Sequence, residues 1–287
     1  MISSQEIAAA AQLACLLEAS APKPGNVSPG IGFHDMRYED FLASAAAIAP
    51  AFLDAGTQPI GETIRRAVVD TRRWTSANTN LGIVLLLAPL ARAAHASSPK
   101  ALRDRVRAVI EATTVSDAAA VYSAIRLARP GGLGEAATED IAASPTVTLA
   151  DAMSLASDRD DIAREYVTGF ERTFTVGAPA LAKARAAGLD WTDAIVECYL
   201  ALLANSPDTL IMRKLGPHAA DLVRERAIEV RAAGGMRTNS GRRAVAQFDQ
   251  ELRDARNSRN PGTTADIAAA AIFVALLNGG WNGGWER

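Results

Sequence analysis

Acidic side chains in polar loops are the first residues of this sequence that could do chemistry. They are Asp35, Glu135, Glu139, Asp140, Asp208 and Asp266, and they lie in loops built from Gly, Pro, Ser, Thr and Asn. Several carboxylates brought together would suit a hard cation such as Mg²⁺, which takes one or two protein carboxylates together with waters and phosphate oxygens. The alternative is that each acid caps a helix, which Asp208 after Pro207 and Asp266 after Thr264 fit well.

A histidine and several cations complete the set of candidate groups. His34 lies beside Asp35 in a loop, which makes it the best general-base candidate among the three histidines. Lys23, Arg213, Lys214 and Arg259 could bind phosphate, although each alone is more typical of a surface charge. No paired histidine spacing indicates zinc. The Gly-rich segment 131–134 follows a helical pattern instead of a strand, which argues against a dinucleotide fingerprint.

Five loops must position these groups, namely 21–36, 76–82, 130–140, 205–209 and 257–266. The segment 21–36 lies between helical patterns and is predicted to be irregular, because Pro22, Pro24 and Pro29 fix φ and push the preceding residues out of the α region. A rigid polar loop between apolar helices is a natural place for chemistry, and the alternative is an ordinary helix connection.

Almost every other segment has the period of an α-helix. The expected helices cover 3–19, 38–53, 61–74, 99–112, 116–128, 148–156, 160–174, 178–187, 192–204, 210–214, 218–233, 238–257 and 264–277, and a further one begins near residue 83. No alternating pattern predicts strands. We therefore predict an all-α fold, a single compact domain over 1–287 of about a dozen helices, with a Gly- and Trp-rich tail, 278–287, of uncertain order.

Composition narrows the class of protein. A net charge of −2, a pI near 6.0 and 5% aromatic residues argue against nucleic-acid binding. The longest apolar runs fall short of the roughly 20 residues that a membrane span needs, and the N-terminus lacks a secretory signal. Cys15 and Cys198 lie in apolar helical patterns and are expected to be buried thiols. We expect a cytoplasmic protein that acts on small molecules.

Several motifs follow one another along nearly the whole chain. They are PKPGNV at 22–27, FHDM at 33–36, FLASAAAIAP at 41–50, NTNLG at 78–82, LGEA at 133–136, PDTLIMRKLG at 207–216, FDQELR at 248–253 and NPGTTADIAAAAIFVALL at 260–277. In this order they resemble the triphosphoribosyl-dephospho-CoA synthase family, whose enzymes prepare the prosthetic group of citrate lyase and malonate decarboxylase.

The resemblance implies an ATP-dependent transfer in which adenine is displaced and the 5-triphosphoribosyl group moves to a ribose hydroxyl of dephospho-CoA. Carboxylates would stabilise the oxocarbenium-like state, and Mg²⁺ with cations would hold the triphosphate. The implied catalytic residues are His34 as base, Asp35, Glu135 and Asp208. The implied nucleotide-binding residues are Lys23, Pro24, Gly25, Asn78, Asn80, Arg213, Lys214, Gly262 and Thr263. The implied metal ligands are Asp35, Glu135, Asp140 and Asp266.

Two segments depart from the family pattern: a DTN…RGG-type segment is altered over 208–216, and the second departure is at 78–82. Enzymes of the citrate-lyase type carry an NTHKG-like segment, so Asn80 and Leu81 replace a histidine and a lysine. Asn80 cannot act as a base, and Leu81 cannot bind phosphate. The chain therefore resembles a divergent branch found in methanogens and one-carbon-metabolising bacteria, for which a precursor of a pterin or furan C1 carrier is a candidate acceptor.

Two other functions stay open at this stage. The same clustered acids could serve a hydrolase that acts on an N-glycosidic or phosphoester bond with water as acceptor. Alternatively, the chain could be a non-catalytic binding or assembly protein that kept the fold. The two nearly all-apolar helices could be covered by the bundle interior or by a second copy, so a homodimer is an alternative to a monomer.

Overall fold

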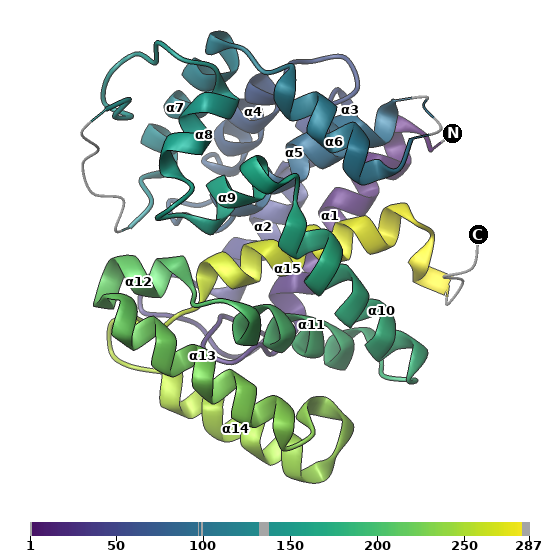
Figure 1. Ribbon diagram of the computed structural model, residues 1–287, viewed down its shortest axis with the longest axis vertical. Helices are drawn as coiled ribbons and strands as arrows, with labels where there is room; N and C mark the ends of the chain where they lie inside the picture. Colours follow the sequence, from purple (N-terminus) through teal and green to yellow (C-terminus); the bar gives the residue numbers. More distant parts are fainter. Residues whose placement is uncertain (1, 97, 99, 132–137, 283–287) are drawn as a thin grey trace. The chain divides into compact units, whose positions relative to one another are not determined.

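A computed structural model describes residues 2–96, 98, 100–131 and 138–282 of the chain (Figure 1). These residues form helices joined by loops, and their β structure is limited to an isolated bridge between Ser28 and Ile31. The predicted all-α fold is therefore confirmed. The chain divides into two compact units, one of residues 1–15 and 39–171 and the other of residues 16–38 and 172–287. The single domain over 1–287 stays a prediction.

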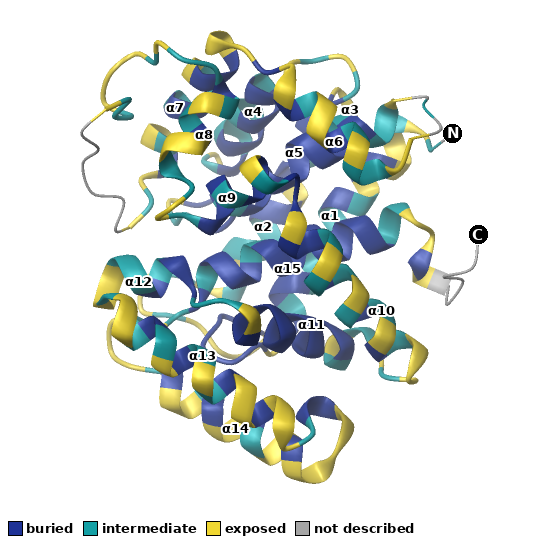
Figure 2. Ribbon diagram, viewed as in Figure 1, coloured by how far each residue is buried: buried dark blue, intermediate teal, exposed yellow. Residues whose placement is uncertain are grey.

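The first unit contains most of the N-terminal helices. They are α1 (Ser4–Ser20), whose C-terminal end belongs to the second unit, α2 (Tyr38–Ala47), α3 (Ala49–Leu53), α4 (Ile60–Thr71), α5 (Leu81–His95), α6 (Leu102–Glu111), α7 (Val115–Ala128), α8 (Leu149–Ala156) and α9 (Asp161–Thr168). Ser3 and Glu6 form a capping box at the start of α1. Helix α5 is the centre of this unit, because most of its residues are buried (Figure 2).

Helices α4 and α7 form the closest pair in the first unit. The Gly61 amide of α4 donates to Asp117 Oδ1 of α7 at 2.9 Å. A Cβ on Gly61 would lie 2.5 Å from the Asp117 carbonyl oxygen, so only glycine permits this approach. Asp117 also completes a capping box with Thr114 at the start of α7. The Asp117 carboxylate thus caps the start of α7 and also binds the backbone of α4.

The second unit contains the C-terminal helices. They are the π-helix η1 (Thr173–Gly177), α10 (Ala178–Ala186), α11 (Trp191–Asn205), α12 (Thr209–Leu215), α13 (Pro217–Ala232), the 3₁₀ turn η2 (Gly235–Arg237), α14 (Asn239–Leu252), α15 (Gly262–Leu277) and the 3₁₀ turn η3 (Gly280–Asn282). Helices α11 and α15 are buried along most of their lengths and pack against each other (Figure 2). The nearly all-apolar segment 264–277 is thus covered largely by the interior of this unit.

The largest departures from the predicted helices concern three of them. The helix expected over 38–53 breaks between α2 and α3, because Pro50 has no N–H to donate back along the helix. The helix expected over 160–174 ends at Gly169, which adopts a left-handed conformation. The helix expected over 238–257 ends at Leu252, because Arg253 is extended and Asn257 has a φ of 50°. The last change places the residues after Leu252 in a loop.

Other expectations concern the thiols, the membrane and the tail. Cys15 and Cys198 are buried, and burial raises the pKa of the Cys198 thiol to about 12, so it stays protonated at neutral pH. No helix in the described ranges is long and apolar enough to cross a membrane. Within the tail, Trp281 stacks on Trp191 with ring centroids 5.4 Å apart, while residues 283–287 lie outside the described part.

Candidate active site

The predicted site residues are distributed over both units. Asn78, Asn80 and Asp140 belong to the first unit, and the other described ones belong to the second. Glu135 lies outside the described residues. The meeting of all five loops at one pocket stays a prediction. Within the second unit, the predicted residues fall into a buried polar set and an open cluster, which differ in their partners and their exposure.

Lys23 belongs to the buried polar set, which consists of Glu18, Lys23, Asn26, Tyr199 and Asp208, each less than 10% exposed. The Lys23 amine lies 2.9 Å from Glu18 Oε1, and it also donates to the backbone oxygens of Glu18 and Ala21. An ammonium group this deeply buried needs a charge partner and hydrogen bonds, and here it has both. The structure therefore gives Lys23 a structural partner, whereas we expected it to face phosphate.

The next three residues of this loop are held by polar side chains. The Tyr199 hydroxyl donates to the Pro24 carbonyl at 2.8 Å, and the Asn26 amide donates to Pro24 O and to the Tyr199 hydroxyl at 3.1 Å each. Burial raises the pKa of Tyr199 well above its usual value, so its hydroxyl stays a donor. The Gly25 amide donates to Asp249 Oδ1 at 2.8 Å. Pro24 and Gly25, predicted to bind nucleotide, thus form a tightly held turn.

Asp208 is the helix cap that the sequence offered as an alternative. Its Oδ1 accepts from the amides of Leu210 and Ile211 at 2.9 and 3.1 Å, at the start of α12. Its Oδ2 accepts from both the amide and the hydroxyl of Thr264 at 2.7 Å, near the start of α15. The carboxylate is fully buried. Asp208 therefore joins the first turns of two helices, while its predicted catalytic role stays a prediction.

Three further predicted residues lie in the first turns of α15. Gly262 and Thr263 are its first two residues, and Thr263 is buried with its hydroxyl accepting from Thr209 at 3.3 Å. Asp266 is the fifth residue, so it lies beyond the position of a cap. The expectation that Asp266 caps this helix is therefore wrong, because Asp208 receives the amide and hydroxyl of Thr264 instead.

The open cluster consists of His34, Asp35, Lys214 and Asn257. The side chains of His34 and Asp35 are 60% and 56% exposed, and His34 Nδ1 lies 3.7 Å from Asp35 Oδ1. The Asn257 amide nitrogen lies 3.2 Å from the same Nδ1. When this amide donates to Nδ1, the neutral ring carries its proton on Nε2 and presents a donor instead of a lone pair. In this orientation His34 would act as a hydrogen-bond donor, while Asp35 remains an exposed acceptor.

Lys214 supplies a positive charge that interacts electrostatically with Asp35. Desolvation lowers the pKa of its amine, while the charges of Asp208 and Asp35 raise it and the nearby Arg213 lowers it. The residue as a whole is exposed near the end of α12, so its ammonium group can meet an anionic ligand. Arg213 precedes it on the same helix and is half-buried.

Asp254 borders the open cluster and is held within its own loop. It accepts from the amide of Arg256 at 2.8 Å, from the amide of Ser258 at 3.1 Å and from the Ser258 hydroxyl. These hydrogen bonds lower its pKa to about 2, the Ser258 hydroxyl being the largest cause. Asp254 is therefore ionised at neutral pH and shapes the turn that carries Asn257.

In the first unit, the altered NTNLG segment is a buried turn. Asn80 is 6% exposed and donates to the Thr71 hydroxyl at 3.0 Å, and Asn78 Oδ1 accepts from the Leu81 amide at 3.3 Å. Leu81 is buried as the first residue of α5. Thr79 contacts the Ser44 hydroxyl. Asn80 and Leu81 thus support the fold of this turn.

The predicted metal ligands do not form one set among the described residues. Asp140 lies in a local turn and accepts from the Ala142 amide at 2.8 Å, and Asp35 and Asp266 belong to the other unit. No group of three or more His, Cys, Asp or Glu side chains in the described ranges could hold a metal ion. A fully protein-coordinated site of Asp35, Glu135, Asp140 and Asp266 stays a prediction, because Glu135 is not described.

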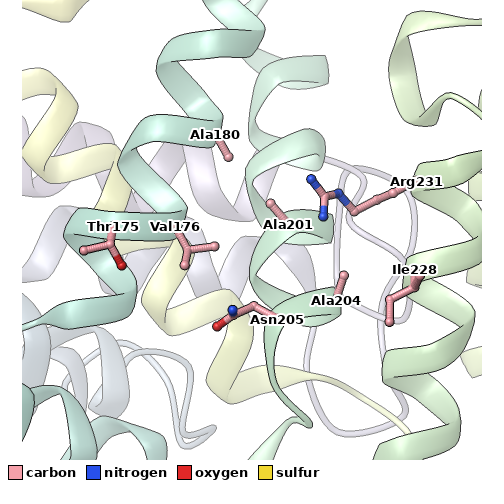
Figure 3. A pocket seen from close by; sticks show the side chains of 8 residues that line it. All are labelled: Thr175, Val176, Ala180, Ala201, Ala204, Asn205, Ile228 and Arg231. Carbon is pink, nitrogen blue, oxygen red and sulfur yellow. The ribbon is translucent and has the colours of Figure 1, made fainter.

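A cavity of about 390 Å³ lies elsewhere in the second unit. Figure 3 shows its lining, which combines alanines of α10 and α11 with Val176, Ile228 and three polar residues, Thr175, Asn205 and Arg231. None of the predicted site residues lines it. Asn205 ends α11 and is also the first residue of the predicted loop 205–209, so the cavity includes one residue of that loop but none of the open cluster.

Sequence reasoning missed the residues that hold these loops. Asn26, Asp249, Arg253 and Asn260 lie in the motifs quoted above, but without knowledge of their partners they read as surface or loop residues. Tyr199 lies in an apolar helix, where a tyrosine is usually a core residue. The available signal was a hydroxyl in an otherwise apolar segment, since a buried tyrosine hydroxyl usually finds a hydrogen-bond partner.

A family model and a solved structure both relate this chain to the same family. The family model described as ATP:dephospho-CoA triphosphoribosyl transferase matches residues 4–284. The crystal structure of a protein described as a triphosphoribosyl-dephospho-coA synthase from Archaeoglobus fulgidus is 33% identical, with a TM-score of 0.65 over 83% of this chain and 99% of that chain.

Curated relatives carry a related name, probable 2-(5''-triphosphoribosyl)-3'-dephosphocoenzyme-A synthase. The protein from Pseudomonas putida is 36% identical over 106 residues, which cover 37% of this chain and 37% of that protein. The protein from Pseudomonas syringae pv. syringae is 25% identical over 279 residues, which cover 88% of this chain and 84% of that protein. The 36% identity thus covers about a third of the P. putida protein, whereas the 25% identity covers most of this chain.

Proposed function

Because the chain belongs to the ATP:dephospho-CoA triphosphoribosyl transferase family, we propose that it transfers the triphosphoribosyl group of ATP to a hydroxyl acceptor and releases adenine. The observation that carries this proposal is the family match over residues 4–284, together with an exposed donor, acceptor and cation in one cluster of the second unit. In the reaction, the bond between ribose C1′ and adenine N9 breaks and a bond from C1′ to the acceptor oxygen forms. The bonding electrons leave with adenine, and the hydroxyl proton must be removed.

The open cluster supports a division of these tasks. His34, held by Asn257 at Nδ1, would donate from Nε2 to the departing purine, and this replaces the role of base that we expected for it. Asp35 would accept the hydroxyl proton and oppose the positive charge at C1′. Lys214 would pair with the triphosphate, as a point charge suited to phosphate.

The donors of the site fit Mg²⁺ held mainly by its substrate. Mg²⁺ commonly keeps waters and phosphate oxygens and takes only one or two protein carboxylates. Asp35 is an exposed carboxylate next to the cation Lys214, so it would be the protein ligand in the second unit. When bound, the ion would neutralise the charge of the triphosphate.

The acceptor is the least constrained part of the proposal. The curated relatives are named for dephospho-CoA. In this chain Asn80 and Leu81 are buried in a turn of the first unit, where the citrate-lyase type has a histidine and a lysine. A different hydroxyl acceptor, such as a precursor of a C1 carrier, therefore belongs to the proposal as the second acceptor. A cytoplasmic location and a homodimer are expectations that go with it.

The experiment measures the release of adenine from ATP in the presence of Mg²⁺ and each candidate acceptor in turn. We expect adenine and an acceptor whose mass has risen by one triphosphoribosyl group. Free triphosphoribose without an adduct would assign a hydrolase instead. Absence of both ATP binding and adenine release with every acceptor would contradict the proposal and favour a binding protein.

A further inference from the structure

Asp249 and Arg253 form a bidentate ion pair at the end of α14. Arg253 donates to Asp249 through Nε at 2.8 Å and through Nη2 at 2.6 Å. Both residues are partly buried. A bidentate guanidinium–carboxylate pair has a fixed geometry, so each partner can hold a third group at a defined position.

Both partners bind the backbone of the loop 21–36. Asp249 Oδ1 accepts from the Gly25 amide at 2.8 Å, and Arg253 Nη2 donates to the Asn26 carbonyl at 2.9 Å. Asn260 adds donors to Gly25 O at 2.8 Å and to Asn26 Oδ1 at 3.0 Å. We name these three side chains, Asp249, Arg253 and Asn260, the loop brace. Through it, the amide and the carbonyl of Gly25 are both bound by side chains from the far end of the chain.

The turn at Gly25 leaves no room for adjustment. Gly25 has a φ of 73°, and a Cβ at this position would lie 2.9 Å from two atoms of Leu252, the last residue of α14. The backbone therefore lies directly against the end of the helix that carries Asp249. A change in the brace moves the turn, because the contact is too close for the helix and the loop to slip independently.

The same segment also reaches the open cluster. Asn257 lies between Arg253 and Asn260 in the chain, and its side chain contacts His34 Nδ1 at 3.2 Å. The two loops are thus tied twice, once at Gly25 and Asn26 by the brace and once at His34 by Asn257. The backbone of Asn257 is left-handed, with a φ of 50°, a conformation that asparagine adopts more readily than most residues other than glycine.

We propose that Asp249 and Arg253 are positioning residues, which place the loop 24–35 so that His34 and Asp35 face the reacting ribose. This inference rests on the proposed function. It concerns the placement of the loop, and neither residue is required to touch the substrate. A purely structural ion pair would instead support only the stability of the fold.

The variants separate the two roles. D249A removes both the ion pair and the acceptor of the Gly25 amide, and D249N removes the charge but keeps an acceptor oxygen. The exchange D249R/R253D restores an ion pair but leaves the Gly25 amide without its acceptor. E251A is the matched control, because Glu251 lies on the same helix as Asp249 and its carboxylate pairs with Arg226 of α13 at 2.8 Å.

The measurements are kcat and KM for adenine release, thermal stability, and hydrogen exchange of the Gly25 amide. We expect D249A to lower kcat by about 10²-fold with KM for ATP within about threefold, since small misplacements of reacting groups cost rate more than binding. D249N recovers part of kcat. The exchange variant recovers stability but not kcat, and the Gly25 amide exchanges faster in D249A than in E251A.

Either of two results would overturn the inference. One is a kcat of the exchange variant equal to that of the wild type, which would show that the ion pair matters only for folding. The other is equal protection of the Gly25 amide in D249A and E251A. If the wild-type protein releases no adenine, the proposed function fails separately, and exchange at Gly25 still decides whether the brace holds the loop.

Discussion

The loop 21–36 contains two kinds of charged residue, and the difference between them is large. Lys23 is 1% exposed and paired with Glu18, whereas the side chains of His34 and Asp35 are more than half exposed. Charged residues of one loop therefore divide into those that hold the loop and those that can meet a ligand.

Desolvation explains why the division is so sharp. A buried charge is tolerated only with a partner and hydrogen bonds, and its removal leaves the partner uncompensated. An exposed charge interacts weakly with its neighbours and is free to bind a ligand. The buried polar set should therefore respond to substitution mainly in stability, and the open cluster mainly in activity.

The largest effect is expected for Lys23→Met. The substitution leaves Glu18 buried without its partner, and we expect a loss of about 3–5 kcal/mol in the free energy of unfolding, measured by chemical denaturation. The double variant E18M/K23M should regain much of this stability, since replacing both partners by apolar groups is often nearly neutral. A K23M protein of wild-type stability that no longer binds ATP would place Lys23 with the ligand-binding residues instead.

A somewhat smaller effect is expected for Asp208→Ala. The change removes the acceptor for the first turn of α12 and for Thr264. A lost cap costs about 0.5–2 kcal/mol and an unsatisfied buried donor about 1–3 kcal/mol, so we expect about 3 kcal/mol in total by urea unfolding. The free energy of unfolding of Asp208→Asn should lie between those of the wild type and of Asp208→Ala. Unchanged stability with lost adenine release would favour direct catalysis by Asp208.

The open cluster should show the opposite pattern in His34→Ala. Because His34 is exposed, we expect the free energy of unfolding to change by less than about 0.5 kcal/mol. Adenine release should fall by about 10²-fold, the usual contribution of one proton-transfer group, which corresponds to about 2.7 kcal/mol in the barrier. An H34A enzyme with the wild-type rate would remove His34 from the site.

The smallest effect concerns Asp254, which borders the cluster. Its pKa is lowered to about 2 chiefly by the Ser258 hydroxyl, so its contribution to stability is present at neutral pH and is lost as the pH falls through that value. In Ser258→Ala we expect the Asp254 pKa to rise toward 3.8, as measured by NMR titration, with adenine release nearly unchanged at neutral pH. An unchanged pKa would show that backbone amides alone hold this carboxylate.

The helical pattern and the position of the loops could be predicted from the sequence, because helix period, prolines and caps are local properties. Thr148 as a cap and Asp208 as the alternative cap follow from short-range pattern alone. The sequence could not show that Lys23 is buried. Its pairing with Glu18 of α1 depends on the path of the loop, which is not a local property of the sequence. The brace was equally hidden, since Asp249 meets Gly25 from the other end of the chain.

A crystal structure of the protein with a non-reactive ATP analogue and Mg²⁺ would test the central claim most directly. We predict that the triphosphate contacts Lys214, that Asp35 lies at the metal or the ribose, and that Lys23 remains paired with Glu18. A structure in which Lys23 has left Glu18 to bind phosphate, with His34 and Asp35 facing only solvent, would contradict the account.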